Sequence, residues 1–122
     1  MARFAIGVDL GGTNLRVAAV DDSGKLLETI TTETAVARGR ESVVEEMCAA
    51  IEELTERHGG KQQAISGIGI GVPGIIDMER GMVRESPNLP GWHDFPVQEA
   101  IEKRLGTHVV LENDANAAAF GE

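Results

Sequence analysis

The stretch "GVDLGGTNLRVA" (residues 7–18) places two adjacent glycines between two apolar segments. The flanking segments, Phe4–Leu10 and Leu15–Asp21, have the length and residue types of β-strands, so the glycines occupy the turn of a predicted hairpin. A phosphate group that approaches such a turn needs backbone N–H groups with no Cβ atom in the way, and glycine supplies both. Gly11 and Gly12 therefore predict a phosphate-binding turn, and a plain Asx or glycine turn remains the alternative.

The polar residues beside the two glycines extend this prediction. Thr13 offers a hydroxyl and Asn14 an amide, and both groups are neutral, so the turn can hold anionic oxygens without a lysine. Asp9 would repel a polyphosphate unless a hard cation lay between them, directly or through water. Because Mg²⁺ prefers oxygen ligands, we expect Mg²⁺ beside Asp9.

The rest of the chain alternates strand and helix patterns. Residues 21–24 have the composition of a hairpin turn, and Ser42 with Glu45 predicts a capping box for a helix that stops at residues 59–60. Asp94 is a candidate N-cap for a second helix, which ends at Gly106. Further strands are expected over Lys25–Thr32, Ile65–Val72, Met82–Arg84 and His108–Glu112, and a last helix over Ala115–Phe120.

This order of elements predicts an α/β domain with a mixed sheet flanked by helices and Phe4–Leu10 as its central strand. Residues 69–74, "GIGVPG", spell the dinucleotide-binding fingerprint of a Rossmann fold. That fingerprint requires a helix after its glycines, whereas "IID" (75–77) continues as turn and strand. We therefore expect no nicotinamide site.

Composition limits the classes of partner. The 122 residues suffice for one domain, and 42% hydrophobic content can fill one core. A net charge of −9 makes nucleic acid and anionic membranes unfavourable partners. No segment is long and apolar enough to span a bilayer. The single cysteine, Cys48, excludes an internal disulfide framework and favours a cytoplasmic location.

Four motifs follow one another along nearly the whole chain: "DLGGTNLRVA" (9–18), "GIGIGVPGIID" (67–77), "NLPGW" (88–92) and "ENDANAAAFGE" (112–122). In this order and spacing they resemble the bacterial sugar kinases of the ROK family, and most closely its glucokinases. The resemblance implies an RNase H-like ATPase lobe, the fold shared by actin, hexokinase and Hsp70. That fold agrees with the predicted order of elements.

The resemblance also implies roles for individual residues. The phosphate loop for ATP would comprise Gly11, Gly12, Thr13 and Asn14, with Asp9 near Mg²⁺. Asn14 differs from the lysine often found at its position in the wider family. Asp114 would be the catalytic base, and the residues that contact the hexose would be Gly74, Asn88, Asn113 and Asp114. Without the motif, Asp114 would be interpreted as the N-cap of an alanine-rich helix, and Trp92 is interpreted first as a packing anchor.

The implied activity is transfer of phosphate from ATP to a hexose, with glucose as the first candidate. Family members continue into a second lobe, so residues 1–122 resemble the N-terminal lobe of a longer kinase. We expect this lobe to be nearly inactive alone, because half of the ligand-binding cleft is missing. The preferred hexose, the phosphoryl donor and any homo-oligomer of the full protein stay open. Two alternatives remain: a sugar-sensing ROK transcriptional regulator without kinase activity, and an actin-like or Hsp70-like ATPase. ROK regulators carry a DNA-binding segment before the phosphate loop, whereas this loop begins at residue 9, and the acidic net charge also argues against DNA binding. Actin-like and Hsp70-like ATPases do not predict the motifs "NLPGW" and "ENDANAAA".

Overall fold

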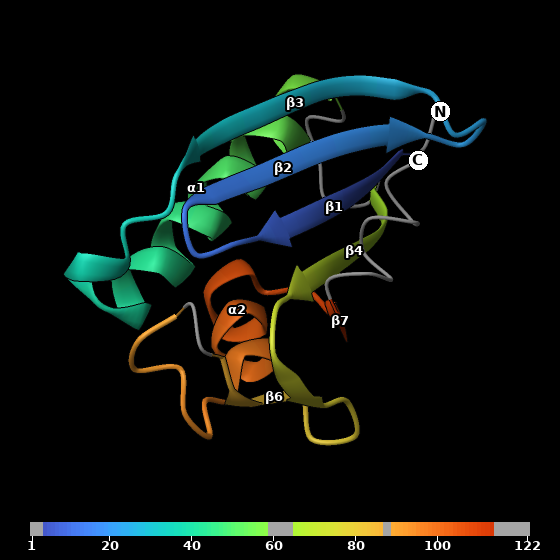
Figure 1. The fold of residues 1–122 in the computed structure, drawn as a ribbon. Helices are drawn as coiled ribbons and strands as arrows, with labels where there is room; N and C mark the ends of the chain where they lie inside the picture. The colour runs from blue at the N-terminus through green and yellow to red at the C-terminus, as the bar shows by residue number, and fades with distance from the viewer. Residues whose placement is uncertain (1–3, 59–64, 87–88, 114–122) are drawn as a thin grey trace.

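A computed structural model describes residues 4–58, 65–86 and 89–113. Its main feature is a five-stranded sheet in the order β3-β2-β1-β4-β7 (Figure 1). The strands are β1 (Phe4–Leu10), β2 (Asn14–Asp21), β3 (Leu26–Glu33), β4 (Ile65–Val72) and β7 (Val110–Asn113). The strand β1 is central, as predicted, with an antiparallel neighbour in β2 and a parallel one in β4. The predicted mixed α/β sheet is therefore confirmed.

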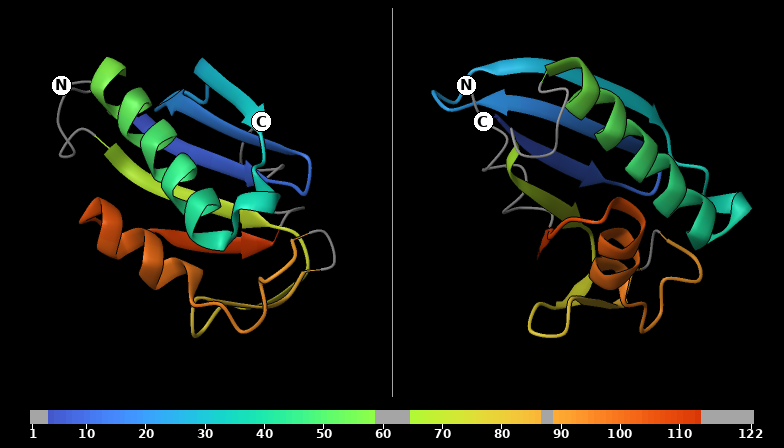
Figure 2. Two further views of the ribbon diagram at one scale, coloured as in Figure 1. Left: turned by 90° about the vertical axis from the view of Figure 1, so that its left-hand side faces the viewer. Right: turned by 180° about the vertical axis from the view of Figure 1, so that it is seen from behind.

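Alternation along β1 fixes which face of the sheet is covered. Its side chains alternate between buried and half-buried, with Ile6, Val8 and Leu10 at most 1% exposed. These residues point toward α1 (Arg40–His58), which packs across β1 and β2 (Figure 2). The apolar stripe predicted for this helix, Val43, Met47, Ile51 and Leu54, is buried in the same core.

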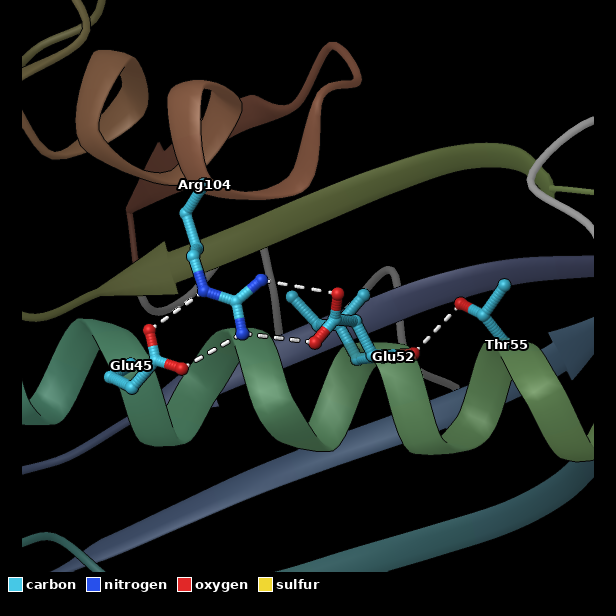
Figure 3. Close-up of polar contacts among 5 residues, drawn as sticks. Glu45, Glu52, Thr55 and Arg104 are labelled. Carbon is cyan, nitrogen blue, oxygen red and sulfur yellow. Dashed lines mark hydrogen bonds and ion pairs between the residues drawn. The ribbon is translucent and has the colours of Figure 1, made fainter.

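The helix α2 (Val97–Leu105) lies beside α1 on the same side of the sheet (Figure 2). An ion-pair network joins the two helices, because the Arg104 guanidinium donates to both carboxylate oxygens of Glu45 at 2.8 Å and to those of Glu52 at 3.1 Å (Figure 3). Arg104 also holds the pKa of Glu45 below its usual range. The network therefore ties the outer surfaces of both helices together.

Replacing Arg104 with Met should lower the midpoint of thermal unfolding at neutral pH, because the two glutamates lose their shared cation. Since the pKa of Glu45 is depressed in the folded state, the stabilisation is present above the ordinary glutamate pKa and is lost as pH falls through the lowered value. The difference between the variant and the wild type, measured by thermal circular dichroism, should therefore shrink on acidification. Arg80→Met is the control, because Arg80 lies 67% exposed and 3.8 Å from its partner Asp77. A difference that does not depend on pH would contradict this account.

The predicted capping box at Ser42 is wrong. The helix α1 begins at Arg40, so Ser42 lies inside its first turn. Gly39, with φ at +96°, closes the short 3-10 helix η1 (Val36–Arg38) and already accepts a hydrogen bond from the N–H of Val43 at 3.2 Å. The carboxylate of Glu45, instead of reaching back along the helix, binds Arg104.

The predicted N-cap at Asp94 is also wrong. Asp94 adopts a positive φ of 48° and its carboxylate accepts a hydrogen bond from Arg84 at 2.9 Å. The residue that precedes α2 is Pro96, and no side chain caps the helix. The predicted end is confirmed, because Gly106 closes α2 in the left-handed conformation with φ at +73°.

Strand boundaries differ from the predictions by one or two residues at several ends. The strand predicted from His108 begins at Val110, because side chains of α2 occupy the backbone of Val109: Glu102 accepts from its N–H at 2.9 Å and Gln98 donates to its carbonyl at 2.8 Å. The turn at residues 21–24 is confirmed: the Asp21 carboxylate accepts hydrogen bonds from the backbone N–H groups of Ser23 and Lys25 at 2.9 Å. The predicted helix stop at 59–60 and the helix over Ala115–Phe120 lie outside the described residues.

A second, two-stranded sheet follows β4. It pairs β5 (Ile75–Asp77) with β6 (Met82–Glu85), and Gly74 makes the connection from β4 with φ at +109°. A strand and not a helix therefore follows the glycines of residues 69–74, which confirms that they do not form a dinucleotide fingerprint. None of the helices in the described parts of the chain combines the length and the apolar character needed to cross a bilayer.

Candidate active site

Those candidate residues that the structure describes on β1, in the turn after it and at the end of β7 lie at one edge of the main sheet. The strands β1, β4 and β7 are parallel, so their carboxyl ends share an edge. The register aligns Asp9 with Gly71, and Gly71 with Glu112 on β7. Two strand spacings separate the backbones of β1 and β7, a distance of about 10 Å. The turn after β1 and the backbone of Asn113, one residue beyond Glu112, therefore lie at the same edge.

The turn between β1 and β2 is closed by its own backbone. The Gly11 N–H donates to the Asn14 carbonyl at 2.9 Å, so this N–H group is used inside the turn. Among the described residues, no acceptor is found for the N–H groups of Gly12 and Thr13. The turn therefore offers two adjacent backbone donors to an anion, which is the arrangement a phosphate requires.

Gly11 shapes this turn by lacking a side chain. A Cβ atom at Gly11 would lie 3.3 Å from the Asn14 carbonyl oxygen, the acceptor that closes the turn. Its φ lies outside the left-handed region, so the preference for glycine is steric, and a side chain here would press on the carbonyl that closes the turn. The backbone of Gly11 therefore sets the turn, while Gly12 and Thr13 present the available donors.

Asp9 lies one residue before the end of β1, on the face of the sheet opposite α1. Its neighbours Val8 and Leu10 are buried beneath the helix, so strand alternation turns the half-buried Asp9 carboxylate the other way. Mg²⁺ in nucleotide sites commonly uses one or two carboxylates together with water and substrate phosphates. A single carboxylate beside the donors of Gly12 and Thr13 fits that set.

Thr34 is a residue that sequence reasoning missed. Its hydroxyl donates to the Gly11 carbonyl at 2.8 Å and its N–H donates to the Thr13 carbonyl at 2.8 Å. Only 8% of Thr34 is exposed. The signal is absent from the sequence because Thr34 is one of several threonines at the end of β3 and its partners lie more than 20 residues earlier.

Gly74, predicted to let a sugar approach the backbone, lies in the short turn between the end of β4 and β5, at the carboxyl edge. A Cβ atom there would be 2.2 Å from the Glu85 carbonyl oxygen and 2.9 Å from the Cα of Ser86. The position is therefore closed to any side chain. Of the other predicted sugar contacts, Asn88 and Asp114 lie outside the described residues, and Asn113 is described only by its backbone.

The loop of "NLPGW" is anchored by its aromatic end. Trp92 is 2% exposed and packs edge-on against Phe95, with ring centroids 4.9 Å apart. The interpretation of Trp92 as a packing anchor is therefore confirmed. Arg40, at the start of α1, donates to the Gly91 carbonyl at 3.1 Å and lies over the Phe95 ring, 4.3 Å from its centroid.

The cysteine takes no part in this site. Cys48 is buried in α1, and burial raises the pKa of its thiol to about 11. The thiol therefore stays protonated at neutral pH and is a poor nucleophile.

Comparison with known proteins assigns the chain to a family. The sequence profile of the ROK family matches residues 5–122. The chain belongs to the ROK family. A similar protein, the glucokinase of Thermotoga maritima, is 45% identical over 117 residues, which cover 96% of this chain and 35% of that protein. The putative xylose repressor of Caldicellulosiruptor sp. is 34% identical over 96% of this chain and 29% of its own length.

A solved structure supports the fold. The ROK family glucokinase of Streptomyces griseus, in complex with glucose and AMPPNP, superimposes with a TM-score of 0.83 at 37% identity, over 98% of this chain and 37% of that one. The expected hexokinase-type ATPase lobe is therefore confirmed. The chain spans about a third of the length of the glucokinases that it matches.

Proposed function

We propose that residues 1–122 form the N-terminal lobe of an ATP-dependent hexose kinase, with glucose as substrate and glucose 6-phosphate as product. The observation that carries the proposal is the shared edge of the sheet, where the donors of Gly12 and Thr13 lie near the end of β7. Two relatives named glucokinases support the choice of reaction and sugar. The single cysteine, Cys48, favours a reducing compartment, and we propose that this compartment is the cytoplasm.

The proposed residues divide the reaction between them. Phosphoryl transfer needs alignment and charge stabilisation more than covalent chemistry. The turn of Gly11, Gly12, Thr13 and Asn14 binds the phosphates of ATP. Asp9 would hold Mg²⁺, and the bound ion would supply charge neutralisation at the phosphates. On the sugar side, Asn88 and Asn113 orient hydroxyl groups, the backbone at Gly74 allows a close approach, and Asp114 accepts the proton of the attacking hydroxyl.

A binding and turnover experiment tests this proposal. One lobe encloses only half of each ligand, so the 122-residue chain should bind Mg²⁺ with AMPPNP weakly, on the order of 1 mM, with NMR shifts centred on the amides of Gly12 and Thr13. A coupled assay with ATP and glucose should show almost no turnover by the chain alone. Asp22→Asn, in the distant turn between β2 and β3, serves as the control and should leave nucleotide binding unchanged.

Two results would contradict the proposal. The first is turnover by residues 1–122 that matches a complete kinase, which would refute the assignment as half of an enzyme. The second is the absence of any shift at the two turn amides at saturating nucleotide, which would refute the phosphate site.

The similarity to the putative xylose repressor of Caldicellulosiruptor sp. supports one alternative, a sugar-responsive regulator that binds sugar without phosphorylating it. The kinase and the regulator differ in the chemistry that they perform. A complete protein that contains this lobe should convert glucose to glucose 6-phosphate if it is a kinase. A regulator would bind DNA and leave ATP unconsumed.

A further inference from the structure

The segment from Thr34 to Arg40 touches both halves of the candidate site. Its first residue reaches the phosphate turn, where the Thr34 side chain and backbone donate to the carbonyls of Gly11 and Thr13. Both carbonyls point away from a bound anion when they are held this way, because a peptide whose oxygen is fixed by Thr34 turns the following N–H to the other side. Thr34 therefore fixes the peptide that carries the Gly12 N–H, and it also holds the carbonyl of Thr13, the residue with the second available donor.

The last residue of the segment reaches the loop that carries "NLPGW". The Arg40 guanidinium donates to the Gly91 carbonyl and covers the Phe95 ring, which in turn packs against Trp92. Arg40 also lies 3.6 Å from the exposed carboxylate of Glu41, a weak contact that does not engage the loop. Because Arg40 contacts both the loop backbone and its aromatic anchor, it fixes the loop against the start of α1.

The residues between these two contacts form a compact spacer. Three consecutive backbone hydrogen bonds of 2.9 to 3.2 Å run through η1, from Val36 to Thr34, from Arg38 to Ala35 and from Gly39 to Val36. Val36 also packs against the core. The length of the segment is therefore fixed by its own hydrogen bonds and not by an extended loop.

We propose that residues 34–40, here called the strap, set the position of the phosphate turn relative to the loop at 89–92. Thr34 and Arg40 are positioning residues in this proposal, because each acts through the backbone of another segment. The inference rests on the proposed function, in which the two segments bind nucleotide and sugar. A reaction that depends on in-line alignment loses rate steeply when its reacting groups shift by about 1 Å, so a rigid spacer between the half-sites serves catalysis.

Thr34 is tested by removing only its hydroxyl. Thr34→Val should raise the hydrogen-exchange rate of the Gly11 amide about tenfold in the 122-residue chain, since one hydrogen bond that holds the turn is lost. The same variant should weaken binding of Mg²⁺ with AMPPNP about tenfold and leave glucose binding within twofold of the wild type. Thr34→Ser restores the hydroxyl and should restore both the exchange rate and nucleotide binding.

Arg40 is tested at the other end of the strap. Arg40→Met should raise the exchange rate of the Trp92 amide, whose hydrogen bond to Leu89 closes the loop, and weaken glucose binding about tenfold with nucleotide binding unchanged. Arg38→Met is the control, because Arg38 belongs to the same strap but is exposed. It should change neither exchange rate nor either affinity.

The exchange and binding data separate the two proposals. If exchange rises locally in both variants but the wild type binds neither ligand, the strap stands and the proposed function fails. The strap is refuted if Thr34→Val and Arg40→Met leave the turn and loop amides as protected as in the wild type. It is equally refuted if each variant lowers both affinities and accelerates exchange throughout the sheet, because that pattern is general destabilisation.

Discussion

Replacing Asp114 with Asn should lower kcat about 10²- to 10⁴-fold in a complete kinase that contains this lobe, because the attacking hydroxyl loses its general base. The substitution separates the two interpretations of Asp114. Asn caps a helix as well as Asp does, so a residue whose only role is the N-cap would tolerate the change. A coupled assay of glucose 6-phosphate formation measures the effect, and the Km for ATP should change little.

A correctly folded variant is needed for this test. The midpoint of thermal unfolding of Asp114→Asn should lie close to that of the wild type, since the cap is retained. Asp22→Asn provides the matched control, because Asp22 is exposed in the turn between β2 and β3, at the opposite edge of the sheet. Wild-type activity in Asp114→Asn would remove Asp114 from the reaction.

The arrangement of the sheet could be predicted from the sequence because local patterns dominate there. The alternation of buried residues along Phe4–Leu10 and the apolar run of Ile65–Val72 depend only on neighbours in sequence. The central position of the first strand followed from the sequence of elements. These features do not depend on knowing which distant residues meet.

The predicted helix caps failed for the opposite reason. A carboxylate near a helix start can bind backbone N–H groups or a distant arginine, and the local sequence does not reveal the second partner. Glu45 binds Arg104, which is 59 residues away, and Asp94 binds Arg84, which lies on β6 and 10 residues earlier. In both cases the carboxylate expected to bind backbone N–H groups pairs with an arginine side chain.

The candidate site was predicted in part. The sequence indicated the glycine turn, and the structure adds that Gly11 uses its own N–H to close the turn while the donors of Gly12 and Thr13 have no acceptor among the described residues. The sequence did not indicate Thr34 or Arg40, because both side chains bind backbone groups of segments that are distant in sequence. Backbone acceptors are the same for every residue type, so no motif marks them.

Replacing Gly74 with Ala should destabilise the protein by about 3 kcal/mol or more, with a fall in Tm on the order of 10 °C. The added Cβ would lie 2.2 Å from the Glu85 carbonyl oxygen and 2.9 Å from the Ser86 Cα, and neither backbone atom can rotate away. The positive φ of 109° adds strain of its own. Relief requires that β5 and β6 separate at the Ile75 and Glu85 pair, which also displaces the chain that leads to the loop at 89–92.

Comparison with Gly24→Ala separates the steric clash from the backbone strain. Gly24 also has a positive φ, of 88°, but nothing lies within 4 Å of its Cβ position, so backbone strain alone should lower the stability of the variant by only about 1 to 2 kcal/mol. Urea unfolding of both variants measures the difference in the free energy of unfolding. If Gly74→Ala costs no more than Gly24→Ala, the close approach of Glu85 is not what requires glycine at position 74. If Gly74→Ala costs clearly more and also weakens glucose binding, the tight turn after β4 is both a structural requirement and the support of the sugar side of the site.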